Sequence, residues 1–131
     1  MSEVPTVHAA RTVLVGVTGG IAIYKAVELV RGLVKDGFQP LVVSTDAAQR
    51  FVMPLTFAAV SQAPVLDDQS AWQASGGWFQ HIEAARKASV MVVAPATANT
   101  LAKMAAGMAD NLLTIAFEEI VDTKIEHDQP E

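Results

Sequence analysis

The sequence predicts an α/β fold of three layers, in which helices cover both faces of a parallel sheet. Short apolar segments alternate along the chain with segments whose apolar residues recur every three or four positions, the pattern of βαβ units. Residues 90–94 are apolar throughout, which is typical of a central parallel strand buried on both faces.

Size and composition favour one domain. The 131 residues are 51% hydrophobic, which is enough for a core. The net charge of −5, without a basic block, argues against a protein whose main work is binding nucleic acid. The absence of cysteine excludes disulfides, thiolate zinc sites and a cysteine nucleophile within this sequence, and it is compatible with a cytoplasmic location.

The two ends differ from the middle. Residues 1–10 lack the apolar segment of a secretory signal and are expected to be a loose leader. Residues 11–120 form the predicted domain, and residues 121–131 form a polar tail that is either frayed or a short edge strand. No apolar run approaches the roughly 18 residues of a membrane span, so we expect a soluble protein.

The first half of the domain predicts a βαβ unit. The β-branched run 12–18 is a strand, and Gly19-Gly20 opens an amphipathic helix that ends near Gly37. Residues 40–45 are a second strand, reached by the right-handed crossover that such units adopt. The helix has apolar residues at Ala26, Val27, Val30, Leu33 and Val34.

The second half contains a loop between shorter elements. Residues 64–66 predict a short strand, and residues 67–77 a surface loop in which Asp67 and Asp68 are solvated. The last helix starts at Asp110 or Asn111. Further helices are predicted at 46–51, 54–61, 81–87 and 97–107, the last with a face of small residues, Ala98, Ala102, Ala105 and Ala106, that permits close packing against a sheet or a partner helix.

Polar residues follow three predicted strands. Thr18 ends the first strand, Ser44 and Thr45 end the second, and residues 97–100 follow the third. Because the carboxyl ends of parallel strands meet at one edge, these groups converge on the crevice where the strand order reverses. Hydroxyls and helix N-termini gathered there suit a mononucleotide phosphate.

The glycine turn by itself is a weak signal. Residues 16–21 have neither the G-x-G-x-x-G spacing of a dinucleotide site nor the G-K-[ST] ending of a P-loop. A tight strand-to-helix turn that binds no ligand is an equally good interpretation of the turn taken alone. The convergence of three loops is what favours a ligand.

His81 is the histidine of the predicted core, because His8 and His127 lie in the terminal segments. A single histidine is more often a surface or packing residue than a catalyst. The sequence has no second ligand at i+4 for zinc and no G-x-S-x-G elbow, so neither a metal site nor a serine hydrolase is predicted.

Five motifs in order resemble the FMN-dependent cysteine decarboxylases, which include phosphopantothenoylcysteine decarboxylase and the enzymes that decarboxylate the C-terminal cysteine of lantibiotic-type peptides. The resemblance covers Arg11 to about Ala116. The motifs are Val17-Thr18-Gly19-Gly20-Ile21-Ala22, Pro54-Leu55-Thr56-Phe57, His81-Ile82-Glu83, Ala94-Pro95-Ala96-Thr97-Ala98-Asn99-Thr100 and Gly107-Met108-Ala109-Asp110-Asn111-Leu112-Leu113.

The resemblance implies a Rossmann-like or flavodoxin-like subunit of a homotrimer or dodecamer, with FMN at subunit contacts and a small-molecule or peptide cysteine as substrate. The flavin would oxidise the thiol-bearing carbon before carboxylate loss, with His81 as the base. The cofactor residues carried over, together with the hydroxyls identified above, are Thr18, Gly19, Gly20, Ser44 and Thr45 around the phosphate, and Phe51, Pro95, Ala96, Thr97 and Ala98 around the flavin.

The sequence departs from this family after Leu113. Family members continue into a further strand and a Pro-Ala-Met-Asn motif that grips the substrate, and this sequence has neither. The pantothenate enzyme's cysteine is absent as well. Pro54 to Phe57 and His81 to Glu83 look most like the pantothenate branch, so pantetheine-precursor decarboxylation is the leading expectation. The alternatives are peptidyl-cysteine decarboxylation, which the absent cysteine taken alone would favour, and a non-catalytic flavin-binding or regulatory paralogue.

Overall fold

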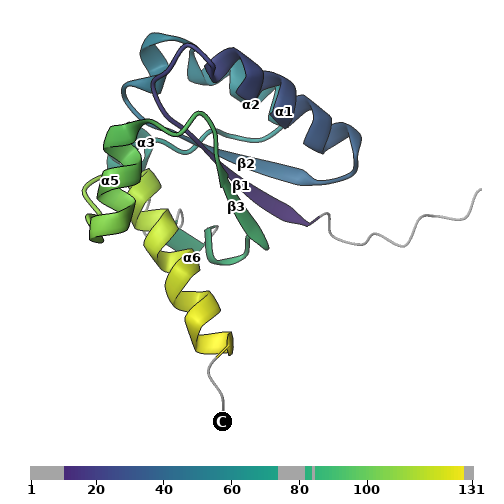
Figure 1. The fold of residues 1–131 in the computed structure, drawn as a ribbon. Helices are drawn as coiled ribbons and strands as arrows, with labels where there is room; N and C mark the ends of the chain where they lie inside the picture. Colours follow the sequence, from purple (N-terminus) through teal and green to yellow (C-terminus); the bar gives the residue numbers. More distant parts are fainter. Residues whose placement is uncertain (1–10, 74–81, 84, 129–131) are drawn as a thin grey trace, which may run out of the picture.

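The sheet is parallel and has β1 at its centre. The computed structural model describes residues 11–73, 82–83 and 85–128. Within them, β1 (Thr12–Val17), β2 (Gln39–Ser44) and β3 (Val90–Val93) form a sheet in the order β2-β1-β3 (Figure 1). Thr12 lies opposite Gln39, and Val13 lies opposite Val90. The strand order therefore reverses beside β1.

Helices cover both faces of this sheet, which confirms the three-layer α/β class. Side chains alternate along β1, so that Val13, Val15 and Val17 pack towards α1 and α2, while Leu14 packs towards α6. Figure 1 shows α1 and α2 on one side of the strands and α6 on the other. The helices are α1 (Ile23–Lys35), the 3₁₀ helix η1 (Ala48–Arg50), α2 (Pro54–Ser61), α3 (Asp68–Gln73), α5 (Ala98–Ala106) and α6 (Leu112–Asp128), and residues 82–83 and 85–86 are also helical.

Local sequence explains where several helices begin and end. α1 ends before Gly37, whose φ of 92° is a left-handed conformation that glycine adopts without strain. α2 begins at Pro54, because proline lacks the N–H that a first-turn residue leaves unpaired. α6 approaches the sheet closely at Gly16, where a Cβ atom would lie 2.9 Å from Leu113 Cδ1.

The prediction that residues 90–94 form a central strand is wrong for the part of the chain that the structure describes. β1 is central because it pairs with both neighbours, and β3 lies at the edge. Val90 is 45% exposed, and the other residues of β3 are half-buried. An apolar run shows that a strand is suited to burial, but it does not determine which strands lie next to one another in the sheet.

Two predicted irregular segments are helical. The expected loop 67–77 begins as helix α3. The expected polar tail is neither frayed nor a strand over 121–128, because α6 continues to Asp128 from a buried turn at Ile120. The short strand predicted at 64–66 is reduced to a single bridge between Leu66 and Val43.

The small-residue face of α5 does not pack against the sheet. Its four alanines, Ala98, Ala102, Ala105 and Ala106, are all exposed. Among the described helices, none combines the length and the apolar character that crossing a membrane requires.

Candidate functional site

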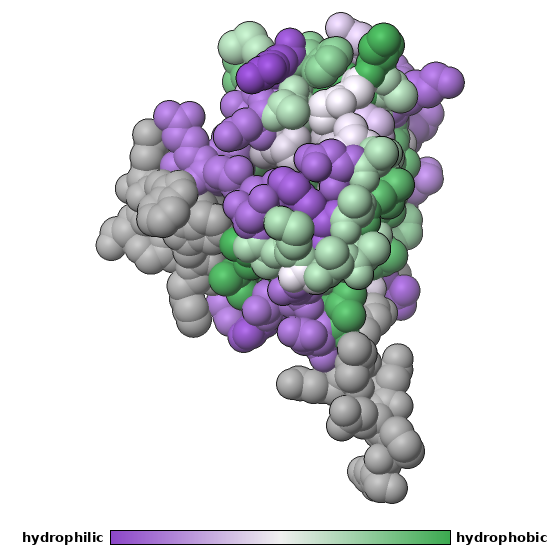
Figure 2. Space-filling model, turned by 60° about the vertical axis from the view of Figure 1, so that its left-hand side comes forward, coloured by the Kyte–Doolittle hydropathy of each residue, from purple (hydrophilic) through white to green (hydrophobic). Residues whose placement is uncertain are grey.

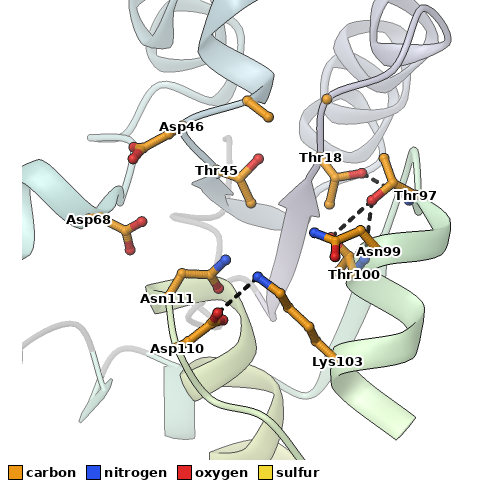
Figure 3. A pocket seen from close by; sticks show the side chains of 12 residues that line it. Thr18, Thr45, Asp46, Asp68, Thr97, Asn99, Thr100, Lys103, Asp110 and Asn111 are labelled. Carbon is orange, nitrogen blue, oxygen red and sulfur yellow. Dashed lines mark hydrogen bonds and ion pairs between the residues drawn. The ribbon is translucent and has the colours of Figure 1, made fainter. Parts of the chain in front are cut away.

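A cavity of about 330 Å³ lies at the carboxyl ends of the strands, where α3, α5 and α6 approach the sheet (Figure 3). Its volume falls within the range of small-molecule sites. The residues that line it come from the three strand-to-helix loops, from α3 and α5, and from the turn before α6: Thr18, Gly19, Thr45, Asp46, Ala47, Asp68, Thr97, Asn99, Thr100, Lys103, Asp110 and Asn111.

The three loops are packed directly against one another. A Cβ atom on Gly19 would lie 2.8 Å from Ala47 Cβ and 3.0 Å from the Ala47 backbone, so only glycine permits this approach. The Thr18 hydroxyl donates to the Pro95 carbonyl oxygen and accepts a hydrogen bond of 3.2 Å from the Thr97 N–H. The loops after β1, β2 and β3 therefore form one continuous wall.

The threonine hydroxyls at this wall already have protein partners. Thr45 Oγ1 donates to the Val17 carbonyl oxygen at 3.3 Å and accepts from the Ala48 N–H at 3.2 Å. Thr97 Oγ1 caps α5 by accepting from the Thr100 N–H at 3.2 Å. These side chains position the backbone around the cavity.

Backbone N–H groups supply the unpaired donors. Those of Gly19, Asp46 and Ala47 bond to no residue that the structure describes. The N–H groups of Ala98 and Asn99 lie in the first turn of α5 and are likewise unpaired within the described chain. Such groups, close to the N-termini of two helices, favour an anion such as phosphate.

The opposite side of the cavity is acidic. Asp46, Asp68 and Asp110 line it together with Lys103, which is the one basic side chain among the lining residues. Figure 3 shows the three carboxylates on the side of the cavity that faces Thr18, Thr97 and Thr100. Carboxylate oxygens accept hydrogen bonds, so this side suits ligand hydroxyl or N–H groups.

Asp68 was expected to be solvated, but it is half-buried. Its Oδ1 accepts a hydrogen bond of 2.7 Å from the Leu112 N–H, at the start of α6. Burial raises the pKa of Asp68 above the ordinary aspartate value, opposed by this hydrogen bond. Asp68 therefore joins α3 to α6 beside the cavity.

Asn111 caps α6 from the cavity wall. Its Oδ1 accepts from the Thr114 N–H at 2.9 Å, and Thr114 Oγ1 accepts from the Asn111 N–H at 3.2 Å. This reciprocal pair satisfies donors at the start of the helix. The expectation that the last helix starts at Asp110 or Asn111 is confirmed to within one residue.

The structure brings together some of the predicted cofactor residues. Thr18, Gly19, Thr45 and Thr97 line the cavity. Gly20 lies beside Pro95, Ser44 is buried, and Phe51 is 43% exposed. The predicted residues that do not line the cavity are Gly20, Ser44, Phe51, Pro95, Ala96 and Ala98.

His81 lies outside the described residues, and its role stays a prediction. Sequence reasoning missed Asp46, Asp68 and Lys103 as lining residues. Lys103 carries a findable signal, because it lies four residues after Asn99 on the same face of α5. Within the described residues, no group of three His, Cys, Asp or Glu side chains is arranged to hold a metal ion.

Comparison with known families identifies the chain. Residues 1–126 match the family described as "Flavoprotein". The chain belongs to the flavoprotein family. This confirms the family and the fold that the motifs indicated.

Relatives of this flavoprotein are found among curated sequences and among solved structures. The coenzyme A biosynthesis bifunctional protein CoaBC of Vibrio parahaemolyticus is 48% identical over 108 residues, which are 81% of this chain. Among solved structures, the FMN-dependent cysteine decarboxylase TvaF from thioviridamide biosynthesis is 30% identical with a TM-score of 0.78, covering 83% of this chain and 67% of TvaF. A PPC decarboxylase variant complexed with pantothenoylaminoethenethiol is 29% identical with a TM-score of 0.69, covering 82% of this chain and 59% of that protein. The match spans about a quarter (26%) of the length of CoaBC.

Proposed function

We propose that this flavoprotein binds FMN in the cavity at the strand ends and decarboxylates a cysteine carboxylate as in coenzyme A biosynthesis. The observation that carries the proposal is the cavity wall, in which three strand-to-helix loops present unpaired N–H groups at the point where the strand order reverses. Family membership supports a flavin as the ligand.

The residues present fit FMN. The unpaired N–H groups of Gly19, Asp46 and Ala47 would hold the phosphate, with α1 starting close by. The acidic side of the cavity would accept hydrogen bonds from the ribityl hydroxyls. The turn after β1 lacks the glycine spacing that accommodates a pyrophosphate, which favours FMN over FAD.

The substrate class follows from the degree of similarity. Identity to the solved structures does not separate the two substrates, because it is 30% to TvaF and 29% to the PPC decarboxylase variant. Identity to CoaBC is 48%, so we favour a pantetheine precursor over a peptide with a C-terminal cysteine. FMN, when bound, supplies the two-electron oxidation that precedes carboxylate loss. The protein would bind and orient both molecules, and His81 is the proposed base.

We also propose that the chain acts as a homo-oligomer, a trimer or a dodecamer, in the cytoplasm. Large apolar side chains are exposed near the starts of α1 and α2: Ile21 is 80% exposed, Leu55 73%, Met53 66% and Tyr24 60%. In Figure 2 hydrophobic residues gather at the upper end and along one edge of the face shown. Such surface is typical of subunit contacts.

The direct test is turnover. The purified chain, supplied with FMN, is incubated with phosphopantothenoylcysteine or with a peptide ending in cysteine, and carbon dioxide release is measured. We expect release from the pantothenoyl substrate, loss of turnover but retention of FMN in His81→Asn, and unchanged turnover in the control His8→Asn. FMN binding without carbon dioxide from either substrate would support the non-catalytic paralogue instead.

A further inference from the structure

Thr18 holds two loops of the cavity in register through a single hydroxyl. Its side chain is buried, with 2% exposed, at the end of β1. Its Oγ1 donates to the Pro95 carbonyl oxygen and accepts from the Thr97 N–H at 3.2 Å. Thr97 is the N-cap of α5, so Thr18 touches the residue that fixes where this helix begins (Figure 3).

These contacts determine which hydrogen-bonding capacity of the Thr18 hydroxyl remains available to a ligand. A threonine hydroxyl carries one hydrogen and two acceptor lone pairs. The hydrogen is committed to Pro95, and one lone pair to Thr97. A phosphate at neutral pH acts almost entirely as a hydrogen-bond acceptor, so a residue that binds it must donate a hydrogen. The one hydroxyl hydrogen of Thr18 is already donated to Pro95, so none is left for a phosphate in this arrangement.

We propose that Thr18 is a positioning residue, which sets the β3–α5 loop and the first turn of α5 against the β1–α1 turn and does not itself bind the cofactor phosphate. This inference rests on the proposed FMN site and assigns one of its residues a different role from the one expected from the sequence. Its effect on flavin binding passes through the backbone of residues 95–99.

Two neighbouring contacts support a role in loop register. Gly20 lies close to Pro95, because a Cβ atom added to Gly20 would be 3.5 Å from Pro95 Cγ, so the two turns approach each other at this point as well. Gly16 accepts a hydrogen bond of 2.9 Å from the Ala94 N–H, which ends the β1–β3 ladder just before the turn. Beyond Ala94, the hydrogen bonds between these two loops within the described residues are those of the Thr18 hydroxyl.

The test compares Thr18→Val, which keeps the branched shape and removes the hydroxyl, with Thr18→Ser, which keeps the hydroxyl. Dissociation constants are measured for FMN and for riboflavin, which lacks the phosphate. Loss of the two hydrogen bonds in Thr18→Val should weaken both ligands by a similar factor, about tenfold, and Thr18→Ser should remain within about twofold of wild type.

Three results would overturn the inference. They are weaker binding of FMN alone in Thr18→Val, no change for either ligand, and a loss in Thr18→Ser as large as in Thr18→Val. The first would make Thr18 a direct phosphate ligand, and the last would assign its role to the methyl group.

A second measurement separates this inference from the proposed function and does not depend on a folded variant. Amide hydrogen exchange of the wild-type chain without flavin should show the Thr97 N–H protected and the Ala98 and Asn99 N–H groups unprotected. Fast exchange at Thr97 contradicts the positioning role even if FMN binds. Protection at Thr97 in a chain that binds neither flavin would refute the FMN site and leave the positioning role standing.

Discussion

Lys103 Nζ lies 2.9 Å from Asp110 Oδ2, which joins the last turns of α5 to the segment that leads into α6. Both residues line the cavity, and the dashed line between them in Figure 3 marks this pair. The hydrogen bond from Lys103 lowers the pKa of Asp110 below the ordinary aspartate value. The ion pair therefore stabilises the fold when the carboxylate is charged.

The ion pair between Lys103 and Asp110 predicts that the protein loses stability as the pH falls. A lowered pKa in the folded state gives a contribution that is present above the ordinary aspartate pKa and is lost as pH falls through the folded value. Asp110→Asn should therefore unfold at a lower denaturant concentration than wild type at neutral pH. The difference should disappear in acid, and a constant difference across the pH range would contradict the ion-pair account.

Asp68 predicts the opposite dependence of stability on pH. Burial raises its pKa, so its contribution is fully present below the ordinary aspartate pKa and is lost as pH rises through the folded value. Asp68→Asn keeps an acceptor for the Leu112 N–H and removes the half-buried charge. We expect this variant to be more stable than wild type at neutral pH and equal to it in acid, as measured by denaturant unfolding. A destabilised variant at neutral pH would mean that the charged cap on α6 outweighs the cost of burial.

The two glycines of the first turn should respond differently to alanine. Gly19→Ala places a Cβ 2.8 Å from Ala47 Cβ, so the first two loops must separate, at a cost of about 1–3 kcal/mol and with loss of FMN affinity. Gly20→Ala meets Pro95 at 3.5 Å, an ordinary contact, and is the matched control. Unfolding curves and flavin fluorescence titrations measure both effects. Equal losses in the two variants would show that close packing of the loops is not what the site requires.

The exposed apolar surface predicts a specific assembly defect. Leu55 is 73% exposed in the single chain, and a charge there should dissociate the proposed oligomer. Light scattering should therefore give a smaller molar mass for Leu55→Asp than for wild type. Its circular dichroism spectrum should be unchanged. Arg31→Asp, an exposed position two turns into α1, should keep the wild-type mass. A wild-type chain that is monomeric at micromolar concentration contradicts the assembly proposal.

The sequence predicted local elements better than distant contacts. The βαβ unit, the start of α2 at Pro54 and the glycine stop at Gly37 follow from neighbouring residues, and all three are confirmed. The order of strands was not predictable from the apolar run at 90–94, because strand pairing depends on residues far along the chain. The end of α6 was missed because polar residues after Ile120 are compatible with either helix or tail.

The candidate site divides in the same way. Thr18, Gly19, Thr45 and Thr97 were expected at one edge because parallel strands bring their carboxyl ends together, and the cavity contains them. Asp68 was missed because its partner, the Leu112 N–H, is 44 residues away. The sequence also does not show that Thr18 uses its hydroxyl to bind other parts of the protein, because both of its hydrogen-bond partners belong to another loop.

Binding of FMN in the cavity is tested most directly by titrating the purified chain, stripped of bound small molecules, with FMN and separately with FAD. Flavin fluorescence reports the binding. Mass spectrometry of the cofactor released from the chain as purified accompanies it. We expect saturable binding of one FMN per chain, much weaker binding of FAD, and FMN as the released cofactor. A chain that binds no FMN, or that releases FAD, would contradict the assignment of the cavity.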